Sequence, residues 1–283
     1  MGCQSRRRDY GRQWFELDDR RLAEAGMLYS QKGVWNRRQL LPADWVAEAS
    51  RKQVANSFDG YGYQWHMGRG TAFLADGLFT QLSIVFPDQD AVLAVFSAVP
   101  KEPNLMSIIW KHFPSAFQVK PLPASAGAVM LAQREAKLRL LDPLTLTSSP
   151  TSRKVSGRAF KLASNDQGAD SVVFNFTRDQ VRYTLTDSRG SHDIVAGLAQ
   201  WYEQNTTMPG ARLHHEYEPD TMRVVAGAVW RSPDALEMTW QYVESAFRDT
   251  VLRRFDGDRV AIERHVNLNS GELKLPTLKG TLA

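Results

Sequence analysis

Cysteine is almost absent from this chain of 283 residues, and its scarcity excludes two kinds of structure. An intramolecular disulfide needs two cysteines and a zinc site built on cysteine ligands needs several, whereas Cys3 stands alone. A chain without disulfides fits a reducing compartment, so we expect a cytoplasmic protein. We also expect neither a metal ion nor a cofactor.

Long apolar runs are missing as well. No stretch approaches the roughly 20 apolar residues that a membrane-spanning helix requires. The arginines near the N-terminus are not followed by the apolar core of a signal peptide. Arg6 stands where the myristoylation pattern needs Ser or Thr, so Met1-Gly2-Cys3 is not read as a lipidation signal. We therefore expect no membrane partner.

A strong charge of one sign is also lacking. The 35 basic and 31 acidic side chains give a formal net charge of +4, which is too weak to indicate nucleic-acid binding. The one basic cluster is Arg6, Arg7, Arg8 and Arg12. Residues 1–16 show no hydrophobic period, so we expect this cluster to be a solvated part of a disordered segment.

The first part of the chain has the pattern of helices around an antiparallel sheet. Apolar residues at helical spacing predict a helix over 18–31, with Gly33 in the left-handed position after it. Pro42 opens a second helix over 43–49. Alternating or apolar runs then predict strands, and a further helix over 104–113 follows them. The predicted strands are 61–66, 71–75, 81–86 and 91–97.

The second part of the chain has a different pattern. Residues 114–154 are rich in Pro, Ser and Thr and predict a linker with a helix over 129–141. Residues 155–283 contain short alternating runs separated by turn residues, which indicate an antiparallel barrel or sandwich. The predicted fold class is therefore α+β, with a partial sheet in 1–113 followed by this β-rich domain. Its predicted strands are 157–163, 171–176, 180–186, 192–196, 212–218, 223–230, 235–242, 247–255, 259–265 and 275–280.

Several motifs in the first part occur in a specific order. They are Trp35-Asn36, Leu40-Leu41-Pro42-Ala43-Asp44-Trp45-Val46, Tyr61-Gly62-Tyr63-Gln64-Trp65, Asp76-Gly77-Leu78-Phe79-Thr80-Gln81, and Val85-Phe86-Pro87 with Asp90-Ala91-Val92. This order resembles the C-terminal part of the serine β-lactamase-like hydrolases, a family shared with penicillin-binding proteins and esterases. The resemblance covers about 18–113. Residues 155–283 are similar to a β-rich C-terminal domain of some of these hydrolases.

The resemblance implies a cleft for acyl transfer, in which a Ser-x-x-Lys serine attacks a carbonyl group and a Tyr-x-Asn tyrosine assists. Neither motif occurs in this chain. Thr151 and Lys154 have a similar spacing, but they lie in the linker, and chance explains them better. An inner-strand element is present in altered form, with Thr80 where Gly is common. The implied cleft and oxyanion candidates are Asp76, Gly77, Phe79, Thr80 and Gln81, with Tyr63 and Trp65 at the cleft rim.

The sequence therefore predicts one wall of a cleft and no catalytic residue. The leading hypothesis is a truncated serine hydrolase that is inactive alone and meets a small-molecule substrate only when the missing half is supplied. A bare sheet face of several hundred Å² costs roughly 10 kcal/mol, so we expect self-association through the exposed sheet edge. The alternative is a non-catalytic ligand- or partner-binding module built on the β-rich domain.

Other polar residues have simpler interpretations. His214 and Glu216 could face a metal from one strand, but a third ligand is missing, so a polar edge strand is expected. Ser83 and Ser97 lie on apolar strands and are expected to bond to backbone. The tryptophans of the β-rich domain are expected to fill its interior, with a ligand cavity in a barrel as the open alternative. They are Trp201, Trp230 and Trp240.

Overall fold

The computed structural model describes two compact units, which we treat separately. Unit 1 comprises Met1–Met130 and unit 2 comprises Leu131–Ala283, so the division falls inside the segment 114–154. The disorder predicted for 1–16 lies outside the described residues. These are 19–56, 59–99, 105–121, 123–145 and 148–283.

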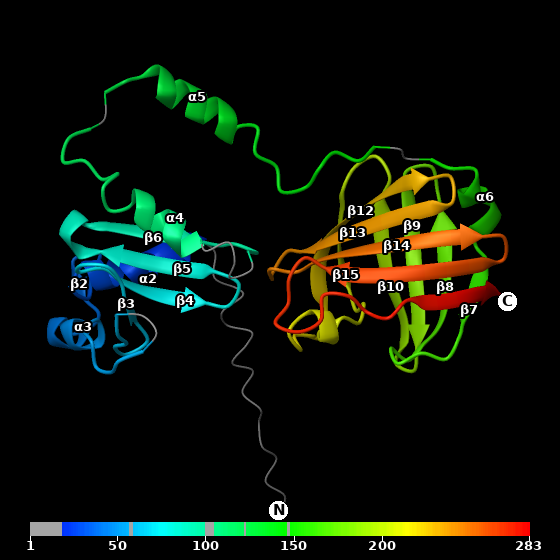
Figure 1. Ribbon diagram of the computed structural model, residues 1–283, viewed down its shortest axis with the longest axis horizontal. Helices are drawn as coiled ribbons and strands as arrows, with labels where there is room; N and C mark the ends of the chain where they lie inside the picture. The colour runs from blue at the N-terminus through cyan, green and yellow to red at the C-terminus, as the bar shows by residue number, and fades with distance from the viewer. Residues whose placement is uncertain (1–18, 57–58, 100–104, 122, 146–147) are drawn as a thin grey trace, which may run out of the picture. The chain divides into compact units, whose positions relative to one another are not determined.

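Within its described residues, unit 1 is built on a four-stranded antiparallel sheet in the order β3-β4-β5-β6 (Figure 1). The strands are β3 (His66–Met67), β4 (Phe73–Gly77), β5 (Gln81–Phe86) and β6 (Ala91–Val95), with the 3-10 turn η1 (Pro87–Gln89) before β6. A small hairpin is formed by β1 (Val34–Trp35) and β2 (Arg38–Gln39). The helices are α2 (Asp19–Ser30), α3 (Ala43–Ala49) and α4 (Leu105–His112), and helix α5 (Ala126–Glu135) spans the division between the two units.

Helices cover both faces of this sheet. On one face, Leu82 and Ile84 are fully buried and pack in a cluster with Ile109 of α4. On the other face, Val85 packs in a cluster with Ala49 of α3 and with a side chain from α2. The prediction of a large bare face is therefore wrong for the described residues, because α4 folds back over the sheet. Strand β6 remains at the sheet edge.

The predicted strand over 61–66 is also wrong. The Gly62 N–H donates to the Trp65 carbonyl at 2.7 Å, which closes a tight turn in place of an extended run. Gln64 takes a left-handed φ of 68°, and only His66 of the predicted run belongs to β3. The alternation of aromatic and small residues there comes from a turn around the buried Trp65 ring, not from an extended strand.

Unit 2 is a barrel of antiparallel strands that is closed by a parallel contact between its first and last strands, with one extra strand paired to the last one. Within its described residues, the sheet has the order β10-β9-β8-β7-β16-β15-β14-β13-β12-β11, and β10 also pairs with β12 (Figure 1). Helix α6 (Thr151–Val155) precedes the strands, and η2 (Ala211–Leu213) lies between β11 and β12. The strands are β7 (Ala159–Leu162), β8 (Ala169–Phe176), β9 (Gln180–Asp187), β10 (Gly190–Gly197), β11 (Tyr202–Thr206), β12 (Met222–Ser232), β13 (Ala235–Tyr242), β14 (Arg248–Asp256), β15 (Arg259–Val266) and β16 (Leu278–Leu282).

The barrel closes where Gly197 of β10 meets Gly227 of β12. A Cβ on Gly197 would lie 1.7 Å from the Gln200 carbonyl oxygen. A Cβ on Gly227 would lie 2.9 Å from atoms of Leu144 and Trp201. Glycine is required at position 197 because a backbone carbonyl occupies the place of a Cβ, whereas at position 227 the neighbouring side chains are close but can shift.

Three predictions for the second half need correction. The run 212–218 is not a strand, because η2 and left-handed residues His215 and Glu216 turn the chain there. A strand that was not predicted, β11, lies just before it. The linker helix occupies Ala126–Glu135 and not 129–141.

The barrel interior follows the expected alternation. Trp230 and Trp240 are buried, as predicted, whereas Trp201 is partly exposed and donates its Nε1–H to the Asp142 carbonyl at 2.9 Å. Among the described residues, no helix is both long and apolar enough to cross a membrane.

We expect Gly197→Ala to destabilise unit 2 by about 1–3 kcal/mol or more, because the added methyl group overlaps a backbone carbonyl that cannot move alone. Urea denaturation followed by tryptophan fluorescence measures the loss. Gly271→Ala is the matched control, since its Cβ would meet its nearest neighbour at 3.8 Å. Equal free energies of unfolding for the two variants would contradict the requirement for glycine at position 197, where the barrel closes.

Candidate functional site

The cleft residues expected in unit 1 lie together at one end of a hairpin. Asp76 and Gly77 end β4, Gln81 begins β5, and Gly77 pairs with Gln81. Between them, Phe79 and Thr80 form the turn with left-handed φ values of 61° and 69°. The five candidates therefore lie at one hairpin end, with Phe79 and Thr80 on the turn and the other three at the adjoining ends of the inner strands β4 and β5.

Hydrogen bonds engage these residues with the segment after β6. The Gln81 side-chain amide donates to the Ser97 carbonyl and accepts from the Ser97 N–H at 3.3 Å. The Ser97 hydroxyl donates to the Thr80 carbonyl at 2.8 Å. Ser83 donates to the Leu22 carbonyl at 3.2 Å, so both serines bond to backbone as predicted. These hydrogen bonds stabilise the turn at Phe79 and Thr80.

The two rim candidates have different environments. Trp65 is 6% exposed and packs against the rings of Tyr29 and Phe73, so its prediction as a rim residue is wrong. Tyr63 is 45% exposed and stacks on Trp45 with ring centres 5.5 Å apart. Of these two side chains, only that of Tyr63 is exposed to solvent.

Thr151 and Lys154 lie on helix α6. The helix has five residues, and the Lys154 side chain is exposed. An activated lysine needs desolvation or a charged neighbour that disfavours its proton. An exposed lysine on a short surface helix does not meet that requirement.

The strongest group of polar side chains lies inside the barrel. His214, predicted on an exposed edge strand, is fully buried, and its Nε2 lies 2.8 Å from Asp249 Oδ1. Arg264 donates to Asp249 Oδ2 through Nε at 2.8 Å and through Nη2. No group of three or more His, Cys, Asp or Glu residues among the described residues could hold a metal ion. The cluster is therefore an ion network, not a metal site.

Attraction between these groups outweighs their burial. Burial by itself would raise the pKa of Asp249, but Arg264 and His214 hold it below its ordinary value. The pKa of Arg264 is raised despite its burial, mainly by Asp249. Burial and the Asp249 charge raise the pKa of the neighbouring Tyr242. Asp249 is thus ionised and Arg264 is charged at neutral pH.

A second arginine in the barrel has no carboxylate partner. Arg253 is fully buried, and its Nη1 donates to the Val251 carbonyl at 2.9 Å. Its Nε and Nη2 have no hydrogen-bond partner among the described residues. Its guanidinium carbon lies 4.0 Å from the centre of the Tyr183 ring. Each unsatisfied buried group costs about 1–3 kcal/mol, and more when it is charged.

Burial lowers the pKa of Arg253 to about 10, with Tyr183 acting in the opposite direction. The side chain therefore keeps its charge at pH 7. Aromatic rings compensate part of the lost hydration by cation–π attraction, since Phe174 and Trp240 lie 5.7 and 6.0 Å from the guanidinium carbon. These two rings provide no acceptor for the N–H groups of Nε and Nη2.

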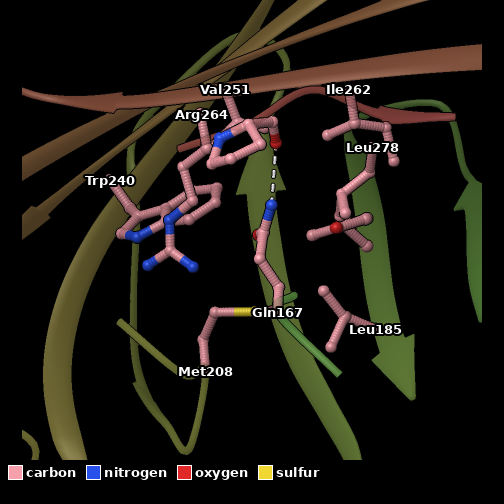
Figure 2. Close-up of a pocket in the computed structure, with 10 residues that line it drawn as sticks. Gln167, Leu185, Met208, Trp240, Val251, Ile262, Arg264 and Leu278 are labelled. Atoms are coloured by element: carbon pink, nitrogen blue, oxygen red, sulfur yellow. Dashed lines mark hydrogen bonds between the residues drawn. The ribbon is translucent and has the colours of Figure 1, made fainter. Parts of the chain in front are cut away.

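A pocket inside the barrel is lined by Arg264 (Figure 2), whereas Arg253 does not line it but lies near two of the lining rings, those of Tyr183 and Trp240. In Figure 2, the Gln167 side chain lies between Trp240 and Arg264 on one side and Leu185 and Leu278 on the other. The space in which a water-sized molecule fits is about 10 Å³, roughly one water. The lining residues are Gln167, Tyr183, Leu185, Met208, Trp240, Val251, Ile262, Arg264, Pro276 and Leu278.

Three loops are joined by polar contacts near this pocket. Gln167 Nε2 donates to the Pro276 carbonyl at 2.8 Å. Arg212 forms ion pairs at 3.0 Å with Asp166 and with Glu272. We call these three contacts the clasp. Its ion pairs are exposed, and such pairs contribute about 0–1 kcal/mol each, so the clasp can open at low cost.

A chain of hydroxyl, imidazole and carboxylate groups lies elsewhere on unit 2. The exposed Thr207 hydroxyl is 2.8 Å from His192 Nδ1, and His192 Nε2 is 3.0 Å from Asp187 Oδ1. This order of groups is found in hydrolases, which also need free N–H donors for the oxyanion.

Such donors are engaged in the residues that follow Thr207. The Met208 N–H donates to the Thr206 hydroxyl, and the Gly210 and Ala211 N–H groups donate to Glu218. Pro209 has no N–H. The chain of groups is accordingly assigned to local structure.

Comparison with known proteins gives little further information. No protein-family model and no curated protein matches this chain. A crystal structure of a fatty acid-binding protein from brain tissue of Drosophila melanogaster aligns at 12% identity with a TM-score of 0.32, covering 46% of this chain and 99% of that one. The fatty-acid-binding protein of Manduca sexta aligns at 9% identity and 0.30, covering 45% and 98%. Likeness at this level carries no argument about the fold or the ligand.

We expect Asp249→Asn to destabilise unit 2 by about 3–5 kcal/mol at pH 7, because it leaves Arg264 buried beside a neutral group. Urea denaturation measures the difference. Asp179→Asn is the control, since Asp179 is exposed and lies 4.0 Å from its partner Arg178.

The loss caused by Asp249→Asn should shrink below about pH 4. The pKa of Asp249 is lowered in the folded state, so between that pKa and the ordinary 3.8 the unfolded chain binds more protons. Acid therefore removes the contribution of Asp249 from the wild-type protein, whereas the asparagine has none to lose. A difference independent of pH between 7 and 3 would show that Asp249 is not ionised in the fold.

Proposed function

We propose that this protein is a non-catalytic small-molecule-binding protein. The barrel of unit 2 takes the ligand into the pocket of Figure 2, and unit 1 is the C-terminal part of a serine β-lactamase-like catalytic domain that lacks its nucleophile. One observation carries the proposal: polar groups with unused hydrogen-bonding capacity lie inside the barrel, next to an apolar pocket.

The pocket has the chemical character of a binding site. Leu185, Ile262 and Leu278 give it an apolar side, while Tyr183 and Arg264 supply polar groups. Binding sites combine a mostly apolar lining with a few polar groups that fix orientation. The pocket is narrow as it stands, so a ligand larger than water requires the clasp to open and side chains to move.

The sequence and unit 1 support the non-catalytic part of this proposal. Ser-x-x-Lys and Tyr-x-Asn are missing from the chain. Gln81 and Ser97, which would lie beside the family's cleft, satisfy each other with hydrogen bonds. In this proposal, common ancestry with serine hydrolases explains the resemblance of unit 1 to them. The binding activity is assigned to unit 2.

We expect no turnover of p-nitrophenyl acetate or of a chromogenic β-lactam above that of the heat-denatured chain, because the sequence lacks the Ser-x-x-Lys and Tyr-x-Asn motifs of the family. Labelling by a fluorophosphonate probe, read by intact mass, tests the same point independently. Turnover that the fluorophosphonate abolishes would overturn the proposal. Thr151→Ala and Thr207→Val would then identify the hydroxyl responsible.

We expect benzoate or its neutral isostere benzamide, at millimolar concentration, to raise the melting temperature of unit 2, because a ligand that binds the folded state stabilises it. Leu278→Trp should abolish the shift by filling the pocket. Lys279→Trp is the matched control, since Lys279 neighbours Leu278 on β16 and is exposed.

Comparison of Leu278→Trp with Lys279→Trp shows whether the probes bind in the pocket. A shift that Leu278→Trp retains would place the binding elsewhere, and absence of any shift with either probe would overturn the binding function. Near-ultraviolet circular dichroism checks that Leu278→Trp keeps the folded barrel. If it does not, the smaller Leu278→Phe replaces it.

A further inference from the structure

The free edge of Arg253 has a matched counterpart in the same barrel. Arg264 presents Nε and Nη2 to the Asp249 carboxylate. Arg253 presents the same two atoms, and they have no partner among the described residues. The Nε–Nη2 edge of a guanidinium fits the two oxygens of one carboxylate. One arginine of the barrel is thus supplied with a carboxylate, and the other is not.

Strand alternation places these groups in one row. Asp249, Val251, Arg253 and Phe255 are successive inward-facing residues of β14. Buried charges in proteins are paired, because an isolated charge is costly away from water. The described residues contain a carboxylate for Arg264 in this row but none that bonds to Arg253.

We propose that a small monocarboxylate with an apolar body binds in the barrel, with its carboxylate on the Nε–Nη2 edge of Arg253. This inference rests on the proposed function and names its ligand class. The apolar body occupies the pocket beside Leu185 and Leu278. The carboxylate neutralises the one unpaired charge of the β14 row.

Charge and shape favour a carboxylate over a phosphate group. A single guanidinium balances one negative charge, whereas a phosphate group carries up to two at neutral pH. The planar pair of carboxylate oxygens matches the planar pair of N–H donors. Aromatic rings of Tyr183, Phe174 and Trp240 surround the guanidinium and favour an organic acid over a hydrated inorganic ion.

Two rings connect the pocket with the arginine. Tyr183 and Trp240 line the pocket, and their ring centres lie 4.0 and 6.0 Å from the Arg253 guanidinium carbon. Because Arg253 has no exposed surface, the carboxylate reaches it only when one of these rings moves. Ligand binding should therefore change the fluorescence of Trp240, which gives the experiment an optical readout.

The test compares benzoate with benzamide on the full chain, by calorimetry and tryptophan fluorescence. The two probes share their size and differ in charge. We expect the wild-type protein to bind benzoate at least tenfold more tightly than benzamide. Arg253→Met should remove this preference while benzamide still binds. Arg254→Met is the matched control and should keep it, since Arg254 is the exposed neighbour on the same strand.

Folding is checked separately. Arg253→Met should unfold at no lower urea concentration than wild type, because it replaces an uncompensated buried charge with an apolar chain. If Arg253→Met does not fold, Arg253→Lys replaces it and should weaken the preference, because an ammonium group lacks the two-pronged edge.

The possible failures can be told apart. Equal affinity of the wild-type protein for benzoate and benzamide would overturn the carboxylate inference and leave the binding function in place. An unchanged preference in a folded Arg253→Met would overturn the role of Arg253. Tighter binding of inorganic phosphate than of benzoate would overturn the ligand class. Binding of none of the three would overturn the proposed function itself.

Discussion

The ion network inside the barrel constrains the rest of unit 2. Asp249 and Arg264 are charged and buried, so each needs the other together with the polar groups around them. His214 enters this network from the segment after β11, which explains why the chain turns there in place of continuing as a strand. A buried histidine bonded to a buried carboxylate fixes that segment over the barrel end, and the clasp through Arg212 holds its exposed side.

Sequence patterns predict elements well where one local rule decides the conformation. The bounds of α3, β5 and β13 agree with the prediction, because a proline start, an apolar run and a regular apolar–polar alternation respectively mark them. The patterns fail where a tertiary contact decides. Trp65 alternates with small residues as a strand residue would, yet its ring is held in the helix-covered core and the chain turns around it.

The site could be predicted only in part, for a related reason. Alternation along β14 shows from the sequence that Asp249 and Arg253 share a face with Val251 and Phe255. Asp249 pairs with Arg264 of the neighbouring strand β15 and not with Arg253 of its own strand. This choice depends on the register between β14 and β15, which the sequence alone does not fix. The His214 contact spans 35 residues and lacks any local signal.

The two units differ in how completely their buried polar groups are hydrogen-bonded. This difference is the basis for the proposed position of the ligand. In unit 1, Gln81 and Ser97 use each other's donors and acceptors at the turn where a cleft was expected. A substrate there would have to break bonds before forming its own. In unit 2, Nε and Nη2 of Arg253 have no hydrogen-bond partner among the described residues, so a ligand that displaces a ring there would gain hydrogen bonds to these atoms without breaking an existing one. Unused hydrogen-bonding capacity, more than the resemblance to a hydrolase, is the basis on which we propose the barrel as the binding site.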